Sequence, residues 1–220
     1  KAQMQRVDEE TQDPLDPVSL RKLLKVIQET IEQGQADVIV FEDYDKGVIS
    51  PVLIAKVVDM ARKHQIPVAV DPKKKHFKDY RNVSLFKPNL KELREGLKLD
   101  SPLDNPREIE QAVHLIQDQL SAEIVLSTLS DKGLFYSRKN RSGIYESELI
   151  PAHTRNISDV SGAGDTVISL AALCLAVNAP VRMLAELCNL AGGLVCEHVG
   201  VIPIDRDTLL AEALRYFKQA

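Results

Sequence analysis

Residues 159–166 combine small residues with acidic ones in the order Asp-Val-Ser-Gly-Ala-Gly-Asp-Thr, just before the most apolar helical stretch of the chain. Gly162, Ala163 and Gly164 have little or no side chain. An anion can therefore approach their backbone N–H groups at the positive end of a helix dipole. Asp165 would then lie in the first helical turn, where its carboxylate can accept a proton from a hydroxyl that attacks a phosphoryl group. The alternative is a plain helix start, with glycine for the turn and aspartate for the dipole.

Short runs of apolar, β-branched residues alternate with helical patterns upstream of this motif. These runs occupy residues 38–41, 68–70, 83–86 and 124–126. Each is nearly continuous, which is typical of a strand buried on both faces of a parallel sheet. Alternation of strands and helices predicts a doubly wound α/β architecture, in which ligands bind beyond the carboxyl ends of the strands.

Helix boundaries are marked by local signals. A capping side chain followed by proline, which favours the first helical position, occurs at Asp16-Pro17, Ser50-Pro51 and Asn105-Pro106. A hairpin is predicted over residues 133–150, and three helices are predicted over 162–178, 181–198 and 205–218. No internal repeat or linker divides the sequence, so residues 1–220 are predicted to form a single domain.

Polar residues follow the predicted strands and are further candidates for a site. Asn89 and Glu92 come after the third strand, a spacing that alone is typical of a helix capping box. Asp43 and Lys46 follow the first strand, and Lys73 follows the second. A substrate that already carries a phosphate would need cations at these strand ends. The lysines after Lys73 fit a solvated loop instead.

Composition excludes several classes of protein. The 220 residues are 44% hydrophobic and carry a net charge of −4, which is typical of a globular protein and argues against nucleic-acid binding. The longest apolar stretch, residues 166–179, is too short to span a membrane. Three cysteines, Cys174, Cys188 and Cys196, lie in helical pattern without zinc-site spacing. We expect reduced core thiols and a cytoplasmic location.

The motif at 159–166 resembles the second signature of the PfkB, or ribokinase-like, carbohydrate kinases, commonly written D-T-x-G-A-G-D. The resemblance extends over nearly the whole chain and implies a ribokinase-like fold with a mainly parallel sheet flanked by helices. It also implies ATP and Mg²⁺ as cofactors. Asp165 would be the catalytic base, and the anion hole would comprise Ser161, Gly162, Ala163 and Gly164.

The same resemblance assigns ATP-binding residues. Asn89 and Glu92 match the N-x-x-E motif, which organises Mg²⁺ indirectly together with the ATP phosphates. The segment after the fourth strand resembles the nucleotide loop T-x-G-x-x-G, although Leu129 replaces a usual glycine. Asp159 and Ser161 match the positions that help to hold a monovalent cation, with K⁺ as the candidate. The remaining expected nucleotide contacts are Ser127, Ser130, Lys132, Gly133 and Asn189.

Two segments, 43–47 and 71–73, resemble the D-glycero-D-manno-heptose-7-phosphate kinases, as do Tyr80-Arg81 and Lys87-Pro88-Asn89. Glu42 stands where that group often has serine. The resemblance implies ATP-dependent phosphorylation of the heptose 7-phosphate to the 1,7-bisphosphate, on a route to ADP-heptose and surface lipopolysaccharide. The expected substrate contacts are Asp43, Lys46 and Lys73.

The family also has an N-terminal part, with a lid over the sugar, that has no counterpart in this sequence. Residues 1–12 are interpreted as a remnant of the strand that returns from the lid, so the fold is expected to be truncated at the N-terminus. A homodimer through that lid is the expected assembly in relatives. Two alternatives remain open: a PfkB kinase for another sugar or a nucleoside, and a nucleotide-binding fragment without activity.

Overall fold

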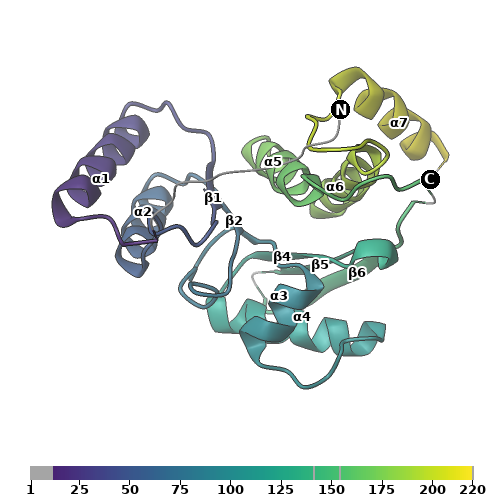
Figure 1. The fold of residues 1–220 in the computed structure, drawn as a ribbon, viewed down its shortest axis with the longest axis horizontal. Coiled ribbons are helices and arrows are strands. Elements are labelled where there is room, and N and C mark those ends of the chain that lie inside the picture. The colour runs from purple at the N-terminus through teal and green to yellow at the C-terminus, as the bar shows by residue number, and fades with distance from the viewer. Residues whose placement is uncertain (1–11, 141, 154, 220) are drawn as a thin grey trace, which may run out of the picture.

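The computed structural model describes residues 12–140, 142–153 and 155–219. Seven α-helices and a mixed sheet form the described part of the chain (Figure 1). The strand predicted at residues 1–12 lies outside the described residues, apart from Gln12.

The sheet has six strands in the spatial order β1-β2-β3-β4-β5-β6. The first four strands pair in parallel, and β4, β5 and β6 pair antiparallel. A mainly parallel sheet at the predicted positions, followed by the predicted hairpin, is therefore confirmed. The strand bounds are β1 Ile39–Glu42, β2 Val68–Asp71, β3 Leu85–Phe86, β4 Ile124–Thr128, β5 Leu134–Lys139 and β6 Tyr145–Ile150.

Helices α1 (Pro17–Glu32), α2 (Pro51–Lys63) and α4 (Pro106–Leu120) each begin at the predicted proline. In each case the preceding Asp, Ser or Asn side chain accepts hydrogen bonds from the first-turn N–H groups. These caps satisfy donors that have no partner within the helix. The remaining helices are α3 Leu90–Leu97, α5 Ala163–Ala176, α6 Val181–Val195 and α7 Arg206–Gln219, with a 3₁₀ turn at Ser130–Lys132.

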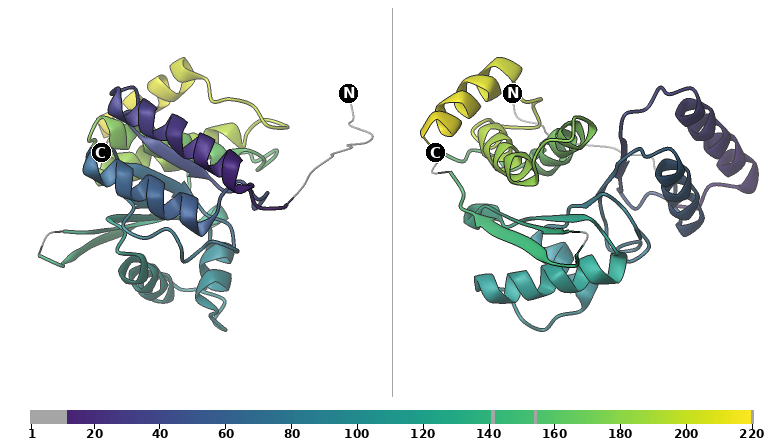
Figure 2. Two further views of the ribbon diagram at one scale, coloured as in Figure 1. Left: turned by 90° about the vertical axis from the view of Figure 1, so that its left-hand side faces the viewer. Right: turned by 180° about the vertical axis from the view of Figure 1, so that it is seen from behind.

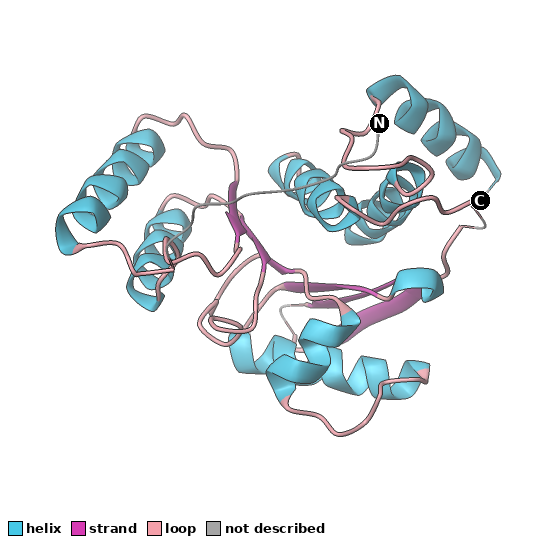
Figure 3. Ribbon diagram, in the orientation of Figure 1, coloured by secondary structure: helices cyan, strands magenta, loops and turns pink. Residues whose placement is uncertain are grey.

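Two apolar cores cover the two faces of the sheet. Alternate residues of β2 show the division, because Val68 and Val70 pack toward α2, α3 and α4, whereas Ala69 packs toward α5 and α6. Successive strand side chains point to opposite faces, so a continuous apolar strand serves both cores. Figures 2 and 3 show helices on both sides of the strands.

The C-terminal helices form the layer that carries the glycine-rich motif. Helix α7 packs on α6 through Leu190, Leu194 and Ala213. Cys174 and Cys188 belong to the core between these helices and the sheet, and all three cysteines are buried free thiols, as predicted. Among the residues that the structure describes, no helix combines the length and hydrophobicity needed to cross a membrane.

Candidate active site

A cleft of about 1210 Å³ lies at the carboxyl ends of the parallel strands, between the starts of α3 and α5 and the side of α6. Parallel strands bring their carboxyl ends to one edge, which is why residues far apart in sequence meet there. Most of the predicted site residues line this cleft. On the strand and nucleotide-loop side they are Lys73, Asn89, Glu92, Ser130, Lys132 and Gly133. On the helical side they are Ala163, Gly164, Asp165 and Asn189.

The start of α5 has the geometry of an anion-binding turn. Gly162 is the N-cap with φ +79°, a left-handed conformation that favours glycine. A Cβ at Gly162 would also lie 2.9 Å from Cγ1 of Val201. A Cβ at Gly164 would meet Lys87 Nζ at 3.6 Å and Asp71 Oδ2 at 3.8 Å, which are ordinary contacts. Gly162 is therefore required by the backbone, whereas Gly164 leaves space beside charged groups.

Asp159 fastens the loop that precedes this turn. Its Oδ1 accepts hydrogen bonds from the backbone N and Oγ of Ser161, at 2.9 and 2.8 Å. Its Oδ2 accepts a hydrogen bond of 3.0 Å from the N–H of Gly200. The hydrogen bonds from Ser161, followed by the one from Gly200, lower the pKa of Asp159. Both oxygens thus already have donors, and the monovalent-cation role of Asp159 and Ser161 stays a prediction.

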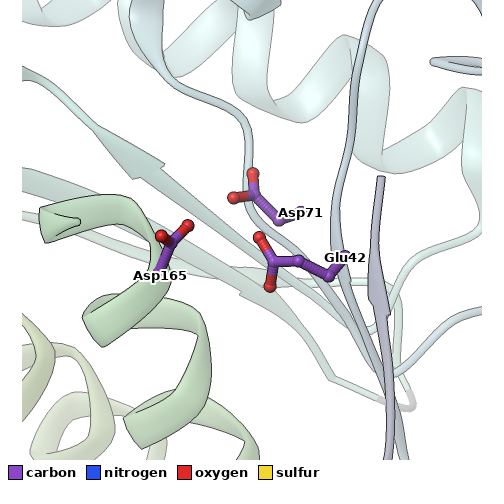
Figure 4. Close-up of side chains that lie close together, drawn as sticks. All are labelled: Glu42, Asp71 and Asp165. Atoms are coloured by element: carbon purple, nitrogen blue, oxygen red, sulfur yellow. The ribbon is translucent and has the colours of Figure 1, made fainter. Parts of the chain in front are cut away.

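Three carboxylates converge beside the glycine-rich turn (Figure 4). Glu42 and Asp71 come from the ends of β1 and β2, and Asp165 comes from the first turn of α5. A carboxylate oxygen of each lies within 4.8 Å of the other two. Lys87 Nζ, which is buried, lies 3.0 Å from Asp71 Oδ1, and the hydroxyl of Tyr44 lies 3.5 Å from Asp165 Oδ1.

Glu42 is the carboxyl group whose acidity this arrangement changes most clearly. Burial, then the charges of Asp71 and Asp165, raise the pKa of Glu42 to about 7, and Lys87 offsets part of this effect. Desolvation and like charges both disfavour the ionised form of an acid. The edge of the sheet beside the cleft therefore contains an acid that exchanges its proton near neutral pH.

The N-x-x-E segment forms a complete capping box. Asn89 Oδ1 accepts from the N–H of Glu92 at 2.8 Å, and Glu92 Oε2 accepts from the N–H of Asn89 at 2.9 Å. Glu92 Oε1 lies 3.2 Å from Lys73 Nζ. The capping box that the spacing of Asn89 and Glu92 predicts is thus present, and it lies within the cleft. Each Glu92 oxygen thus has one donor, and the indirect role of Glu92 in organising Mg²⁺ stays a prediction.

The nucleotide loop after β4 is only partly arranged as predicted. Ser127 is fully buried on the face of β4 shared with Val125, outside the cleft, and its Oγ has no hydrogen-bond partner among the described residues. Thr128 lines the cleft in its place. Ser127 points away from the cleft and Thr128 points into it because adjacent residues of a strand point to opposite faces. Lys132 Nζ donates to the carbonyl of Asp104 at 3.3 Å.

Gly133 is required by close packing at the end of the loop. It has φ +99°, and a Cβ there would overlap the carbonyl oxygen of Ile150. Its left-handed backbone turns the chain into β5, directly beside β6. Glycine is the residue that meets both demands without strain.

The α6 side of the cleft contains the predicted Asn189, together with Arg155 and His153, which were not assigned as site residues from the sequence. Asn189 Nδ2 donates to the carbonyl of Pro151 at 2.9 Å and so holds the segment after β6 against α6. Arg155 lines the cleft and pairs with Glu197 and Glu212, at 3.0 Å each. His153 also lines it, and burial, followed by the charge of Arg155, lowers the pKa of His153.

The predicted sugar contacts divide into two groups. Lys73 lines the cleft, whereas Asp43 and Lys46 do not. Asp43 is buried, and its oxygens accept from the Tyr80 hydroxyl at 2.7 Å and the Asp45 N–H at 2.8 Å. Asp43 therefore organises the loop after β1, and its contact with a sugar stays a prediction. Lys46 is exposed in that loop.

Glu42, Asp71 and Lys87 were not assigned as site residues from the sequence. The available signal was their position, because each is the last residue of a strand or directly follows one. In parallel pairing Glu42 lies opposite Asp71, so a polar residue at both strand ends indicates a shared polar edge.

Comparison with known proteins agrees with the family resemblance of the sequence motifs. The sequence profile described as pfkB family carbohydrate kinase matches residues 13–208. The "bifunctional protein HldE" of Rhodospirillum rubrum is 35% identical over 209 residues, covering 95% of this chain and 40% of the relative. That of Gluconacetobacter diazotrophicus is 36% identical over 210 residues, covering 96% and 42%. The chain thus spans about two fifths of these curated relatives.

Solved structures share the fold. Phosphofructokinase-2 from Escherichia coli in complex with potassium superposes with a TM-score of 0.77 at 19% identity, covering 92% of this chain and 63% of that one. Ribokinase from Arabidopsis thaliana, complexed with ribose and ATP, gives 0.68 at 18% identity, covering 91% and 60%. These likenesses establish a ribokinase-like fold.

Proposed function

We propose a reaction for this chain on the premise that it belongs to the pfkB family of carbohydrate kinases, whose profile matches residues 13–208. The proposed reaction is transfer of the terminal phosphoryl group of ATP to a sugar hydroxyl. The observation that carries it is the placement of the Asp165 carboxylate in the first turn of α5, beside the glycine turn and inside the cleft.

In this reaction Asp165 accepts the proton of the attacking hydroxyl. The N–H groups at Gly162, Ala163 and Gly164 stabilise negative charge on the transferred group, as backbone donors at a helix start can do. Lys87 Nζ lies next to Gly164, held by Asp71, and adds a positive charge at the same point. Phosphoryl transfer depends mainly on such positioning and charge stabilisation.

ATP would lie along the cleft, from this turn to the side of α6. Asn89 and Glu92 are the proposed indirect organisers of Mg²⁺, which supplies charge neutralisation of the phosphates when bound. The other proposed nucleotide contacts are Ser130, Lys132, Gly133 and Asn189, with Thr128 in place of Ser127. A K⁺ ion near Asp159 and Ser161 is part of the proposal, supported by the potassium in the phosphofructokinase-2 structure.

The proposed acceptor is D-glycero-D-manno-heptose 7-phosphate, phosphorylated at its anomeric hydroxyl. Support comes from the similarity along 95% of the chain to proteins named HldE and from the resemblance of segments 43–47 and 71–73 to heptose 7-phosphate kinases. Lys73 supplies a cation inside the cleft, and Lys46 is proposed to approach the sugar phosphate from the loop after β1. A cytoplasmic location and a homodimer complete the proposal.

A second candidate acceptor is fructose 6-phosphate, favoured by the phosphofructokinase-2 fold match. Purified protein should therefore be assayed with Mg-ATP and heptose 7-phosphate, fructose 6-phosphate, ribose and adenosine. We expect the highest kcat/KM with the heptose phosphate. A clear preference for ribose or adenosine would contradict the sugar-phosphate assignment, and no transfer to any acceptor would favour a nucleotide-binding fragment without activity.

The role of the cations is tested with Lys73→Ala and Lys46→Ala. Each should raise the KM for the sugar phosphate more than the KM for ATP. The reason is that loss of a charge-assisted contact weakens binding of the phosphate group that it contacts. Lys74→Ala is the matched control, since Lys74 is exposed and pairs with Glu95 at 3.4 Å, outside the cleft. Equal effects of all three substitutions would contradict a specific phosphate site.

A further inference from the structure

Glu42 occupies a position in the site that the proposed reaction leaves without a role. It is the last residue of β1 and is half-buried. Its carboxylate points toward those of Asp71 and Asp165, with oxygens of all three within 4.8 Å of one another (Figure 4). Glu42 is therefore close to the group proposed to act as base without lining the nucleotide cleft itself.

The charged groups that act on Glu42 lie on β2, on α5 and in the segments after β2 and β3. Asp71 at the end of β2 and Asp165 on α5 are negative, and Lys87 after β3 is positive. Lys87 is held by Asp71 at 3.0 Å, so its charge already offsets one carboxylate. Lys73 after β2 is paired with Glu92 and adds a further positive charge on the cleft side. Tyr44, in the loop after β1, contacts Asp165 through its hydroxyl.

We propose that Glu42 is a positioning residue of the phosphoryl-transfer site that takes up a proton from solvent when the phosphates of ATP bind beside Asp165. The proposal rests on ATP binding by this kinase family and not on the identity of the sugar. The bound phosphates bring more negative charge to a point that already holds three carboxylates. Protonation of Glu42 removes one of those charges and leaves Asp165 ionised to act as base.

The direction of the coupling follows from electrostatics. In the free protein the pKa of Glu42 is about 7, so the group is partly protonated at neutral pH. Nearby negative charge raises the pKa of an acid, so phosphate binding increases the protonated fraction. At pH 7 the uptake is at most about half a proton per ATP, because a group with that pKa starts half protonated. By linkage, the affinity for ATP falls as pH rises above 7.

The test is calorimetric titration of the purified protein with Mg-ATP, without sugar, at pH 7 in two buffers of different ionisation enthalpy. The buffer dependence of the heat gives the number of protons taken up. We expect wild type to take up more protons than Glu42→Gln, by up to about half a proton per ATP. Between pH 6.5 and 8.5 the affinity of wild type should fall by up to about 25-fold more than that of the variant. Protonation of ATP itself contributes equally to both proteins and cancels in the difference.

His153 also lines the cleft and titrates, so His153→Gln is the matched control and should keep the Glu42-dependent uptake. Glu42→Ser is a second variant that removes the acid with a smaller side chain, and it should behave as Glu42→Gln does. Proton uptake that is unchanged in both Glu42 variants would overturn the inference while leaving ATP binding and the kinase assignment intact. Failure of wild type to bind ATP would overturn both.

Discussion

Acidic residues have opposite pKa shifts in the two regions that meet at Asp165. In the glycine-rich loop, Asp159 is surrounded by N–H and O–H donors from Ser161 and Gly200, which lower its pKa. At the strand ends, burial and then the charges of the facing carboxylates raise the pKa of Glu42 to about 7. The same functional group thus ionises more readily in one region and less readily in the other. Neighbouring donors and charges decide the behaviour, not the residue type.

Asp165 belongs to both regions, because its backbone is in the glycine-rich turn and its side chain reaches the strand-end carboxylates. Each region can therefore be perturbed separately and compared with the loss of Asp165 itself.

The largest effect is expected for Asp165→Asn, which keeps the shape of the side chain and removes the base. A positioned general base contributes about 10²–10⁴-fold to rate, so kcat should fall by that factor while the KM for ATP changes little. Steady-state kinetics with saturating sugar substrate measures this. Asp207→Asn is the control, since Asp207 is also acidic in the first turn of a helix but lies outside the cleft. Near-normal turnover of Asp165→Asn would show that another group removes the proton.

A smaller effect is expected from the glycines of the turn. Gly162→Ala forces a side chain into a left-handed conformation and against Val201, at a cost of about 1–2 kcal/mol of folding free energy. Gly164→Ala has ordinary contacts available and should leave the free energy of unfolding nearly unchanged. Urea unfolding followed by circular dichroism compares the two. Equal destabilisation would mean that the loop adapts and that Gly162 is not required by its backbone.

An effect of similar size is expected in the pH dependence of stability. The pKa of Glu42 is raised from 4.5 to about 7, so the folded state binds this proton more tightly than the unfolded state. The free energy of unfolding should therefore fall as pH rises from about 4.5 to 7. Glu42→Gln removes this loss and should be more stable than wild type above pH 7. The difference is about 1–2 kcal/mol, because solvent screens a half-exposed group.

Asp159→Asn sharpens the comparison because the pKa of Asp159 shifts in the opposite direction. A lowered pKa contributes stability above the unfolded value of 3.8 that is lost as pH falls through the folded value. This variant should therefore be less stable than wild type at neutral pH, and the difference should shrink in acid. Thermal unfolding across pH 3 to 8.5 for both variants measures the two signs, and equal signs would contradict the contrast between the regions.

Local sequence determined the elements of this protein. Three helices start where a capping side chain precedes proline, and the parallel strands lie at the continuous apolar runs. The glycine-rich turn before α5 could also be predicted from the sequence, because helix starts and left-handed glycines depend on a few neighbouring residues. The placement of Asp165 in the first turn of α5 followed from the same short segment.

Tertiary structure decided which side chains share the site and how they titrate. Glu42 and Asp71 are brought together by strand register, and Asp165 reaches them from a helix more than ninety residues further along the chain. The raised pKa of Glu42 and the positions of Ser127 and Asp43 away from the cleft also depend on packing. Burial and the distance between charges are properties of the folded chain, so no local pattern specifies them.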